Sequence, residues 1–239
     1  MPAPVPSLDR EVAAWSDALL LVGVDEVGRG PLAGPVVAAA VVFPPGCSRI
    51  RGLRDSKMLP AERRASLAVE VRHRALGIGI GAASTREIDR LNIRVATAVA
   101  MRRALRALFR RLPLAPRAAE PPSRRVAERR DRRRRIELAP FDYETCLVLL
   151  DGLPLPEVGV PHDALVDGDA HCMSIAAAGV VAKTVRDDLM ARLARRYPRY
   201  GWDTNMGYGT SGHHDGLREH GPCIHHRRTF APIAQLQLF

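Results

Sequence analysis

The sequence predicts an α/β fold built around a mixed sheet, because apolar runs of strand length alternate with longer stretches of helical composition. Four apolar runs are typical of strands, at residues 19–25, 36–43, 76–82 and 146–150. Three longer stretches favour helices, at residues 60–75, 85–112 and 175–196. Elements that alternate in this way pack as helices against a sheet.

Individual residues sharpen the expected limits of these elements. Pro60 suits the first turn of its helix, and Pro44 begins a turn that ends the second strand. The long helix has a predicted break near Asn92. Residues 198–230 carry glycine, histidine and aromatic residues without clear periodicity, so we expect loops there with a short helix near 212–220.

The length of 239 residues allows one large domain with appendages. We expect an N-terminal extension over 1–17, a main domain over 18–232 and a C-terminal tail over 233–239. No apolar run reaches the about 18 residues of a membrane span, and the first residues lack the pattern of a secretory signal. Four scattered cysteines without a Cys-x-x-Cys pair are typical of reduced thiols in a cytoplasmic protein. Nothing in the sequence indicates oligomerisation, so we expect a monomer.

The net charge of +10 favours a polyanionic partner, but most of it is local. Residues 110–135 hold 11 arginines against three acidic residues, a net charge of +8. The segment at about 113–140 is rich in Pro, Arg and Glu, which indicates an insertion in the main domain. Such a tract is usually solvated, and a specific nucleic-acid contact is the alternative.

Four acidic residues lie where a sheet and its helix could gather them. Asp25 and Glu26 end the first strand, Asp151 ends the fourth, and Asp187 lies inside the last long helix. Carboxylates that converge repel one another, and divalent cations remove that cost. Two such ions about 4 Å apart can activate water for phosphodiester cleavage. Taken alone, each acid suits a cap or a solvated face at least as well.

The acid pair and the loop after it carry a further expectation. Adjacent residues of a regular strand face opposite sides, so Asp25 and Glu26 cannot both reach one ion from such a strand. We therefore expect the strand to bulge or end there, and Gly28 suits that change of direction. A dinucleotide-binding loop is the alternative for Gly28-Arg29-Gly30, which Pro31 and the acid pair disfavour.

Ordered motifs cover most of residues 19–112 and 146–232. The first spans residues 23–37 and contains Asp25, Glu26 and Gly28-Arg29-Gly30. The later motifs are Asp55-Ser56-Lys57, Glu87-Ile88-Asp89 with Asn92, Asp151-Gly152, Ala182-Lys183-Thr184-Val185-Arg186-Asp187, Gly207-Tyr208-Gly209-Thr210 and His225-His226-Arg227-Arg228-Thr229-Phe230. Together they closely resemble the motifs of bacterial type 2 ribonuclease H, the ribonuclease HII family.

This resemblance implies a ribonuclease H-like mixed five-stranded sheet flanked by helices, with a small C-terminal extension of helices and loops. It implies an endonuclease that hydrolyses the RNA strand of RNA–DNA hybrids and cuts 5′ to ribonucleotides embedded in duplex DNA. The products would carry 3′-hydroxyl and 5′-phosphate ends, and the roles would be ribonucleotide and RNA primer removal. The catalytic, metal-binding acids would be Asp25, Glu26, Asp151 and Asp187, holding two Mn²⁺ or Mg²⁺ ions.

The resemblance also assigns substrate contacts. Gly28-Arg29-Gly30 would sense the 2′-hydroxyl, since its glycines allow close backbone approach. Tyr208 would stack on the deoxyribose after an RNA–DNA junction, with a core tyrosine as the alternative. Lys57, Lys183 and Arg186 would contact phosphates or support the site, and Lys183 alternatively braces its own helix.

The sequence departs from the family pattern at three places. Asn205 and Met206 stand where a His-Lys pair is common, which puts a phosphate contact in doubt. Gly179 replaces a usual serine, which would loosen helix packing, and Leu153 replaces a polar residue. None of these changes removes an expected metal ligand, so activity is expected.

The histidines and the last residues complete the sequence picture. His225 and His226 lack the spacing of a zinc site and suit packing or hydrogen bonding, whereas His213 could approach the substrate. Residues 235–239, Gln235-Leu236-Gln237-Leu238-Phe239, resemble the short peptide that docks on the replication sliding clamp. Folding back onto the domain is the alternative for these apolar side chains.

Two other classes of function stay open from the residues alone. A non-catalytic nucleic-acid-binding module would not need the four acids. A related polynucleotidyl transferase, such as a DNA integrase, would share the acids but not the Gly28-Arg29-Gly30 loop or the Tyr208 motif.

Overall fold

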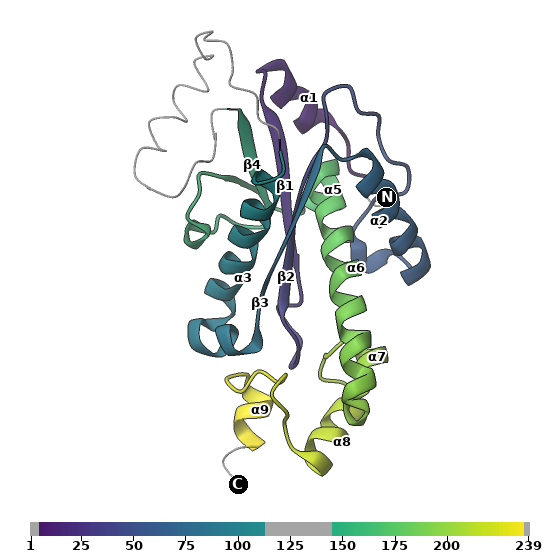
Figure 1. Cartoon of the computed structure of the whole chain (residues 1–239), viewed down its shortest axis with the longest axis vertical. Helices are drawn as coiled ribbons and strands as arrows, with labels where there is room; N and C mark the ends of the chain where they lie inside the picture. The colour runs from purple at the N-terminus through teal and green to yellow at the C-terminus, as the bar shows by residue number, and fades with distance from the viewer. Residues whose placement is uncertain (1–4, 113–144, 237–239) are drawn as a thin grey trace.

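The computed structural model describes residues 5–112 and 145–236 of the chain (Figure 1). The insertion expected at about 113–140 and the last three residues of the expected tail lie outside these ranges. No helix within them is long and apolar enough to cross a membrane. The main elements are α1 (Asp9–Ser16), β1 (Leu20–Val27), β2 (Val36–Val42), α2 (Ala61–Arg74), β3 (Gly77–Ala83), α3 (Thr85–Phe109), β4 (Cys146–Asp151), β5 (Asp163–Leu165), α5 (Gly168–His171), α6 (Met173–Arg196), α7 (Trp202–Asn205), α8 (Ser211–His220) and α9 (Ala231–Leu236).

One mixed five-stranded sheet forms the centre of the fold, with the strands in the order β3-β2-β1-β4-β5. β1 pairs antiparallel with β2 and parallel with β4. β2 pairs antiparallel with β3, and β5 pairs parallel with β4. The carboxyl ends of β1 and β4 therefore point to the same edge of the sheet. β5 was not predicted from an apolar run, because it is only three residues long.

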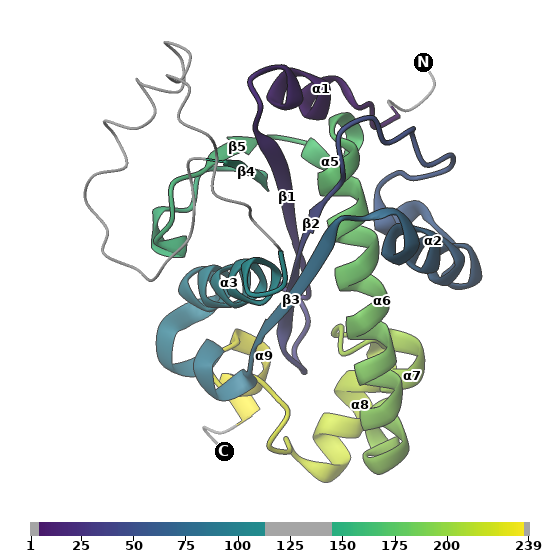
Figure 2. The same cartoon turned by 45° about the horizontal axis from the view of Figure 1, so that its top comes forward.

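Helices cover both faces of the sheet (Figure 2). On one face α3 packs against alternate residues of β1 and β2, such as Val24 and Ala38. On the other face α6 and α2 pack against the intervening residues, such as Ala39. The Gly-Ile alternation of β3 allows α3 to approach closely, since a Cβ at Gly79 would lie 2.0 Å from the Ala104 carbonyl oxygen.

The long helix α3 contains the predicted break. Asn92 has φ 67° and ψ 166°, values outside the helical region. Its Oδ1 accepts a hydrogen bond of 3.1 Å from Val95 N–H, so the side chain caps the second part of the helix.

The N-terminal extension is packed onto the main domain through α1. Glu11 on α1 is 1% exposed, and its Oε1 accepts a hydrogen bond of 2.7 Å from Ser174 N–H in the first turn of α6. A carboxylate at this position satisfies a free helix N–H and complements the helix dipole. The boundary expected after residue 17 therefore does not separate two packing units.

The chain after α6 folds back as a small extension of short helices and loops, as expected. Figure 1 shows α8 and α9 together at the end of the molecule where α6 finishes. The extension packs around Trp202, which is 0% exposed, and α8 is the short helix predicted near 212–220. α9 reaches Leu236 and buries Ile233, so the tail expected from residue 233 begins inside the domain.

Candidate active site

Asp25 and Glu26 leave β1 on opposite faces of the sheet. β1 pairs with β2 in unbroken register up to Val27, with Asp25 opposite Ala39 and Glu26 opposite Ala38. Residues opposite each other share a face, and Ala39 lies beneath α6 whereas Ala38 lies beneath α3. The expectation of a bulge or strand end at this pair is therefore wrong, because the pairing with β2 holds the strand regular beyond it.

Gly179 on α6 makes room for the Asp25 carboxylate. A Cβ at Gly179 would lie 2.3 Å from Asp25 Oδ2. Asp25 is 8% exposed, and its Oδ1 accepts a hydrogen bond of 2.7 Å from Glu26 N–H. The Asp25 carboxylate fills the space that a side chain at Gly179 would occupy. The expectation that Gly179 loosens the helix packing is therefore wrong.

Asp151 ends β4 beside β1 and is joined there by Asp169, which had no role in the sequence-based prediction. Asp151 Oδ1 accepts a hydrogen bond of 2.8 Å from Gly168 N–H, and this contact fixes the start of α5 at the end of β4. Asp169 is the next residue. The sequence signal for it is weak, an Asp-Gly-Asp step at residues 167–169 that also suits an ordinary turn before a helix.

Burial raises the pKa of all four of these carboxyl groups, and repulsion from neighbouring acids adds to it for Asp25, Glu26 and Asp169. For Asp25 burial is the largest cause, the charges of Glu26 and Asp151 follow, and the pKa rises well above its ordinary value. Burial raises the pKa of Glu26 although the Arg29 guanidinium lowers it, and burial raises that of Asp151 against several backbone N–H donors. Burial and then Asp151 raise the pKa of Asp169. A nearby cation would stabilise the ionised forms of all four.

Lys57 supplies a positive charge within reach of these acids. Partial burial lowers the pKa of Lys57, but the carboxylates of Asp55, Asp25 and Asp169 outweigh it and raise the pKa overall. Asp55 also accepts a hydrogen bond of 2.9 Å from Lys57 N–H, which caps the short 3-10 helix over Ser56–Met58. Tyr208 makes the smallest of these contributions to the pKa of Lys57.

Asp187 lies apart from the four clustered acids. Its Oδ2 accepts from Arg64 Nη2 at 2.6 Å, and its Oδ1 accepts from Lys183 Nζ at 2.5 Å. Asp187 follows Gly179, the α6 residue beside Asp25, by eight positions, which is about 12 Å along a helix. The structure therefore does not bring Asp187 into the expected cluster. Asp187 instead forms an ion pair with Lys183 of the same helix.

Arg186 is buried beneath the loop that follows β1. It is 0% exposed, and its Nε, Nη1 and Nη2 donate to the carbonyl oxygens of Pro35, Met206 and Ala33 at 3.1, 3.0 and 3.2 Å. The expectation of a direct contact between Arg186 and a substrate phosphate is therefore wrong, because each guanidinium nitrogen already has a backbone acceptor inside the fold.

The two glycines of the Gly28-Arg29-Gly30 loop serve different purposes. Gly28 has φ +91°, and a Cβ there would lie 2.2 Å from Arg186 Nε, so packing and backbone conformation require glycine. At Gly30 a Cβ would lie 3.6 Å from Tyr208 Cε1, an ordinary contact. Tyr208 itself is 45% exposed, which excludes the alternative of a core tyrosine.

Two buried histidines hold the loop that carries Tyr208. His213 Nδ1 lies 2.9 Å from the Tyr208 carbonyl oxygen, and His213 Nε2 lies 3.1 Å from both Trp202 Nε1 and His226 Nε2. Cys223 N–H donates to His226 Nδ1 at 2.9 Å. Two neutral rings satisfy this pattern, with the proton on Nδ1 of His213 and on Nε2 of His226.

Burial lowers the pKa of both rings, and that of His226 falls to about 4. The hydrogen-bonding role expected for His226 is confirmed. His213 is 0% exposed, so the expectation that it approaches the substrate is wrong.

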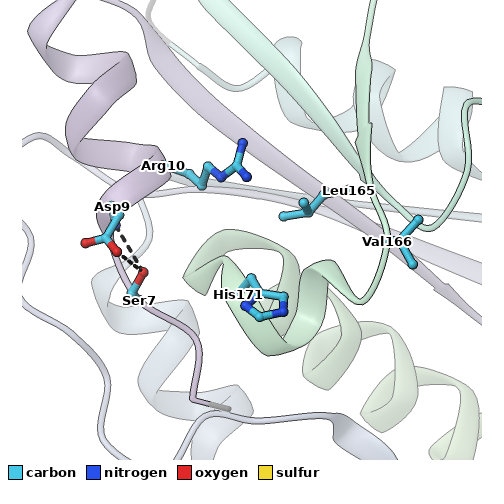
Figure 3. A pocket seen from close by; sticks show the side chains of 6 residues that line it. All are labelled: Ser7, Asp9, Arg10, Leu165, Val166 and His171. Atoms are coloured by element: carbon cyan, nitrogen blue, oxygen red, sulfur yellow. Dashed lines mark hydrogen bonds between the residues drawn. The ribbon is translucent and has the colours of Figure 1, made fainter.

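Two cavities lie near these elements. One of about 290 Å³ is lined by Glu26, Asp151 and Arg29 together with apolar side chains beneath α3. The other, of about 440 Å³, lies between α1 and the β5–α5 region, and Arg10 and His171 line it from its two sides (Figure 3). Of the two, only the first contains members of the acid cluster. In the part of the chain that the structure describes, no three His, Cys, Asp or Glu side chains stand as a ready-made ligand set.

Comparison with known proteins places these features in a family. The family model for ribonuclease HII matches residues 22–113 and 157–233. The chain is 45% identical over 235 residues to a ribonuclease HII of Synechococcus sp. (strain JA-3-3Ab), covering 97% of this chain and 91% of the relative. It is 46% identical over 221 residues to that of Sphingopyxis alaskensis, with 92% and 93% covered.

Solved structures share the fold at lower identity. Ribonuclease H2 from Pyrococcus horikoshii OT3 matches with a TM-score of 0.62 and 20% identity, covering 92% of this chain and 98% of that one. Ribonuclease HII in a complex with PCNA from Archaeoglobus fulgidus matches with 0.62 and 20%, covering 89% and 95%. Bst-RNase HIII in complex with Mn²⁺ matches with 0.67 and 18%, covering 95% and 72%. These likenesses confirm the ribonuclease H-like sheet expected from the sequence.

Proposed function

Because the chain belongs to the ribonuclease HII family and is therefore an endoribonuclease acting on RNA–DNA hybrids, we propose that it also cuts 5′ to single ribonucleotides in duplex DNA. The products would be a 3′-hydroxyl and a 5′-phosphate, and the role would be removal of ribonucleotides and RNA primers. The observation that carries this proposal is the closeness of the Gly28–Gly30 loop and the exposed Tyr208 ring to each other, with the Arg29–Glu26 ion pair of 3.4 Å joining the loop to the acids.

We propose that Asp25, Glu26, Asp151 and Asp169 together hold two divalent ions, Mn²⁺ or Mg²⁺, and the need for two ions is consistent with Asp25 and Glu26 facing opposite sides of β1. When bound, such ions act as Lewis acids for the phosphate and lower the pKa of water. The donor set fits hard cations, since it consists of carboxylates whose burial and repulsion disfavour the ionised state in the absence of a cation. Asp169 takes the place expected for Asp187, whose carboxylate is already neutralised by two basic side chains.

The other residues of the site bind and orient the nucleic acid. Lys57 attracts a phosphate to the edge where β1 and β4 end, because its ammonium group is exposed and lies among the acids. Gly30 has no side chain between the loop backbone and the solvent, so a ribose can approach the backbone closely enough to be distinguished by its 2′-hydroxyl. The exposed ring of Tyr208 stacks on the sugar of the neighbouring deoxynucleotide.

The decisive assay uses a DNA duplex with one ribonucleotide, in Mg²⁺ or Mn²⁺. Cleavage 5′ to that ribonucleotide supports the proposal, and Asp25→Asn should abolish it while binding persists. Asp188→Asn is the matched control, because Asp188 is an exposed acid on α6. Binding without cleavage would instead support a non-catalytic module, and cleavage of the all-DNA duplex would support a DNA transferase.

We further propose that residues 235–239 dock on the sliding clamp and that the enzyme acts as a monomer in the cytoplasm. The peptide pattern supports the first point, and a structural neighbour was solved as a complex with PCNA. Four free cysteines fit a reducing compartment.

A further inference from the structure

Two arginines lie fully buried beneath the Gly28–Pro35 loop without a carboxylate partner. Arg186 and Arg227 are both 0% exposed. Among the described residues neither forms an ion pair, and burial is the main cause that lowers the pKa of each, that of Arg227 to about 9. A buried charge is energetically costly unless polar groups satisfy it. Two buried guanidinium groups in one place therefore indicate a structural or functional role.

Backbone carbonyl groups of the loop satisfy both guanidinium groups. Arg227 donates to the oxygens of Gly34 at 3.0 and 2.9 Å, Arg29 at 2.7 Å and Gly28 at 2.5 Å. Arg186 donates to those of Ala33 and Pro35 on the far side of the loop, and to Met206 two residues before Tyr208. The loop is thus held from inside through its carbonyl groups.

This arrangement determines where the N–H groups of the loop point. In a trans peptide the C=O and N–H bonds point in opposite directions. The Gly28 carbonyl shares a peptide with Arg29 N–H, and the Arg29 carbonyl shares one with Gly30 N–H. Because Arg227 draws both carbonyls inward, both N–H groups are directed outward, and they have no acceptor within the described ranges. Two adjacent free N–H groups form a preorganised site for an oxygen of the substrate.

We propose that Arg227 is a positioning residue for substrate recognition, which turns the N–H groups of Arg29 and Gly30 toward the ribonucleotide, and that Arg186 braces the same loop and ties it to the Tyr208 segment. Arg227 touches no substrate atom. It acts through the peptide planes of residues 28–30. The inference rests on the proposed function, since it concerns the loop that reads the ribose.

The first experiment measures binding in the Asp25→Asn background, in Ca²⁺, to a duplex with one ribonucleotide and to the same duplex in all-DNA form. The ratio of the two Kd values reports recognition of the ribose. Arg227→Lys and Arg227→Gln should each reduce this ratio roughly tenfold, the effect of losing one or two hydrogen bonds. Affinity for the all-DNA duplex should change little. Arg192→Gln is the control, because Arg192 is an exposed arginine on α6.

The lysine variant separates the shape of the donor group from its charge. Lysine keeps a positive charge but lacks the planar fork that reaches several carbonyls at once. An unchanged ratio in Arg227→Lys would overturn the proposal, since charge alone would then suffice. Absence of any preference in the Arg227-intact protein would instead count against the proposed function.

Hydrogen–deuterium exchange of the whole protein measures how firmly the loop is held, also in a variant that is less stable. In the intact protein Leu32, Ala33 and Gly34 N–H groups donate to Gly207 and His225 carbonyls, so they should be protected. Both Arg227 variants should accelerate exchange in peptides covering residues 31–36 while β3 and α3 stay unchanged. Unchanged exchange in residues 31–36 would contradict the proposal that Arg227 holds the loop. Faster exchange throughout the protein would identify a folding defect. In that case Arg186→Lys provides the second test of the same peptides.

Discussion

Asp151 Oδ1 accepts a hydrogen bond of 2.8 Å from Gly168 N–H, and this contact joins the end of β4 to the start of α5. Because the two elements meet there, Asp169 stands within electrostatic reach of Asp25 and Asp151. Asp187, by contrast, is bound by Arg64 of α2 and Lys183 of its own helix. Asp169 therefore lies beside the acids at the strand ends, whereas Asp187 holds two helices together.

Asn substitutions separate these two acids. Asp169→Asn should lower kcat/KM by roughly a hundredfold or more without loss of stability, because a metal-binding carboxylate contributes several kcal/mol to the transition state. Asp187→Asn should retain most of the activity but lower the free energy of unfolding by about 1–3 kcal/mol, because Arg64 loses a partly buried partner. Steady-state cleavage and urea unfolding measure both quantities. The opposite pattern would restore Asp187 as the fourth metal ligand.

Alanine substitutions distinguish the glycines of the loop. Gly28→Ala places a Cβ 2.2 Å from Arg186 Nε at φ +91°, so we expect a loss of about 1–3 kcal/mol in stability. Gly30→Ala places its Cβ in ordinary contact with Tyr208, so stability should stay within about 0.5 kcal/mol while cleavage at the ribonucleotide falls. Thermal unfolding and cleavage assays on the two variants form a matched pair. Equal stability losses would show that the loop packs differently.

Substitution of Tyr208 tests the reading of RNA–DNA junctions. Because the ring is exposed at 45%, Tyr208→Ala should cost little stability. It should lower cleavage at a single embedded ribonucleotide roughly tenfold more than cleavage of a continuous hybrid, as expected for loss of one stacking contact of about 1–3 kcal/mol. Tyr208→Phe retains the ring and should behave like the intact protein. If phenylalanine fails as badly as alanine, the hydroxyl group and not stacking is responsible.

The buried histidine pair predicts a loss of stability in acid. The pKa of His226 in the folded protein is about 4, below the about 6.5 of an unfolded chain, so the unfolded state binds the proton first. Stability from this ring is present above about pH 6.5 and is lost as the pH falls toward 4, by at most about 3 kcal/mol. Urea unfolding at pH 7.5, 5.5 and 4.5 measures this slope.

His226→Gln provides the comparison for that slope, because glutamine does not titrate. Its stability should be lower at pH 7.5 but should fall less steeply below pH 6.5. Parallel curves for the two proteins would mean that other groups cause the acid sensitivity.

The clamp proposal is tested by removing only the end of the peptide. Deletion of residues 237–239 leaves α9 and the buried Ile233 in place, so stability and cleavage of short duplexes should not change. Binding to a bacterial sliding clamp, measured by surface plasmon resonance, should be lost. Gln235→Ala retains the three apolar side chains of the peptide and should weaken binding less. An intact protein that does not bind the clamp would remove this proposal altogether.

Local patterns in the sequence were enough to predict four of the five strands, the long helices, the break at Asn92 and the short helix α8. Each of these depends on residues close together in the chain, such as an apolar run or an Asn that caps the next turn. The strand-end acids Asp25, Glu26 and Asp151 were predicted in the same way, since strand ends meet at one sheet edge. The regular course of β1 was mispredicted because only its pairing with β2 determines it.

The sequence by itself determined an α/β fold of the ribonuclease HII family and the acids at its strand ends. Only the tertiary structure decided that Asp169 joins them and Asp187 does not, and that Arg186 and Arg227 are buried supports of a loop. Nothing in the neighbouring residues distinguishes Arg227 from Arg228. The difference arises when segments far apart in the chain come together, because burial and hydrogen-bond partners are properties of the packed chain and not of the local sequence.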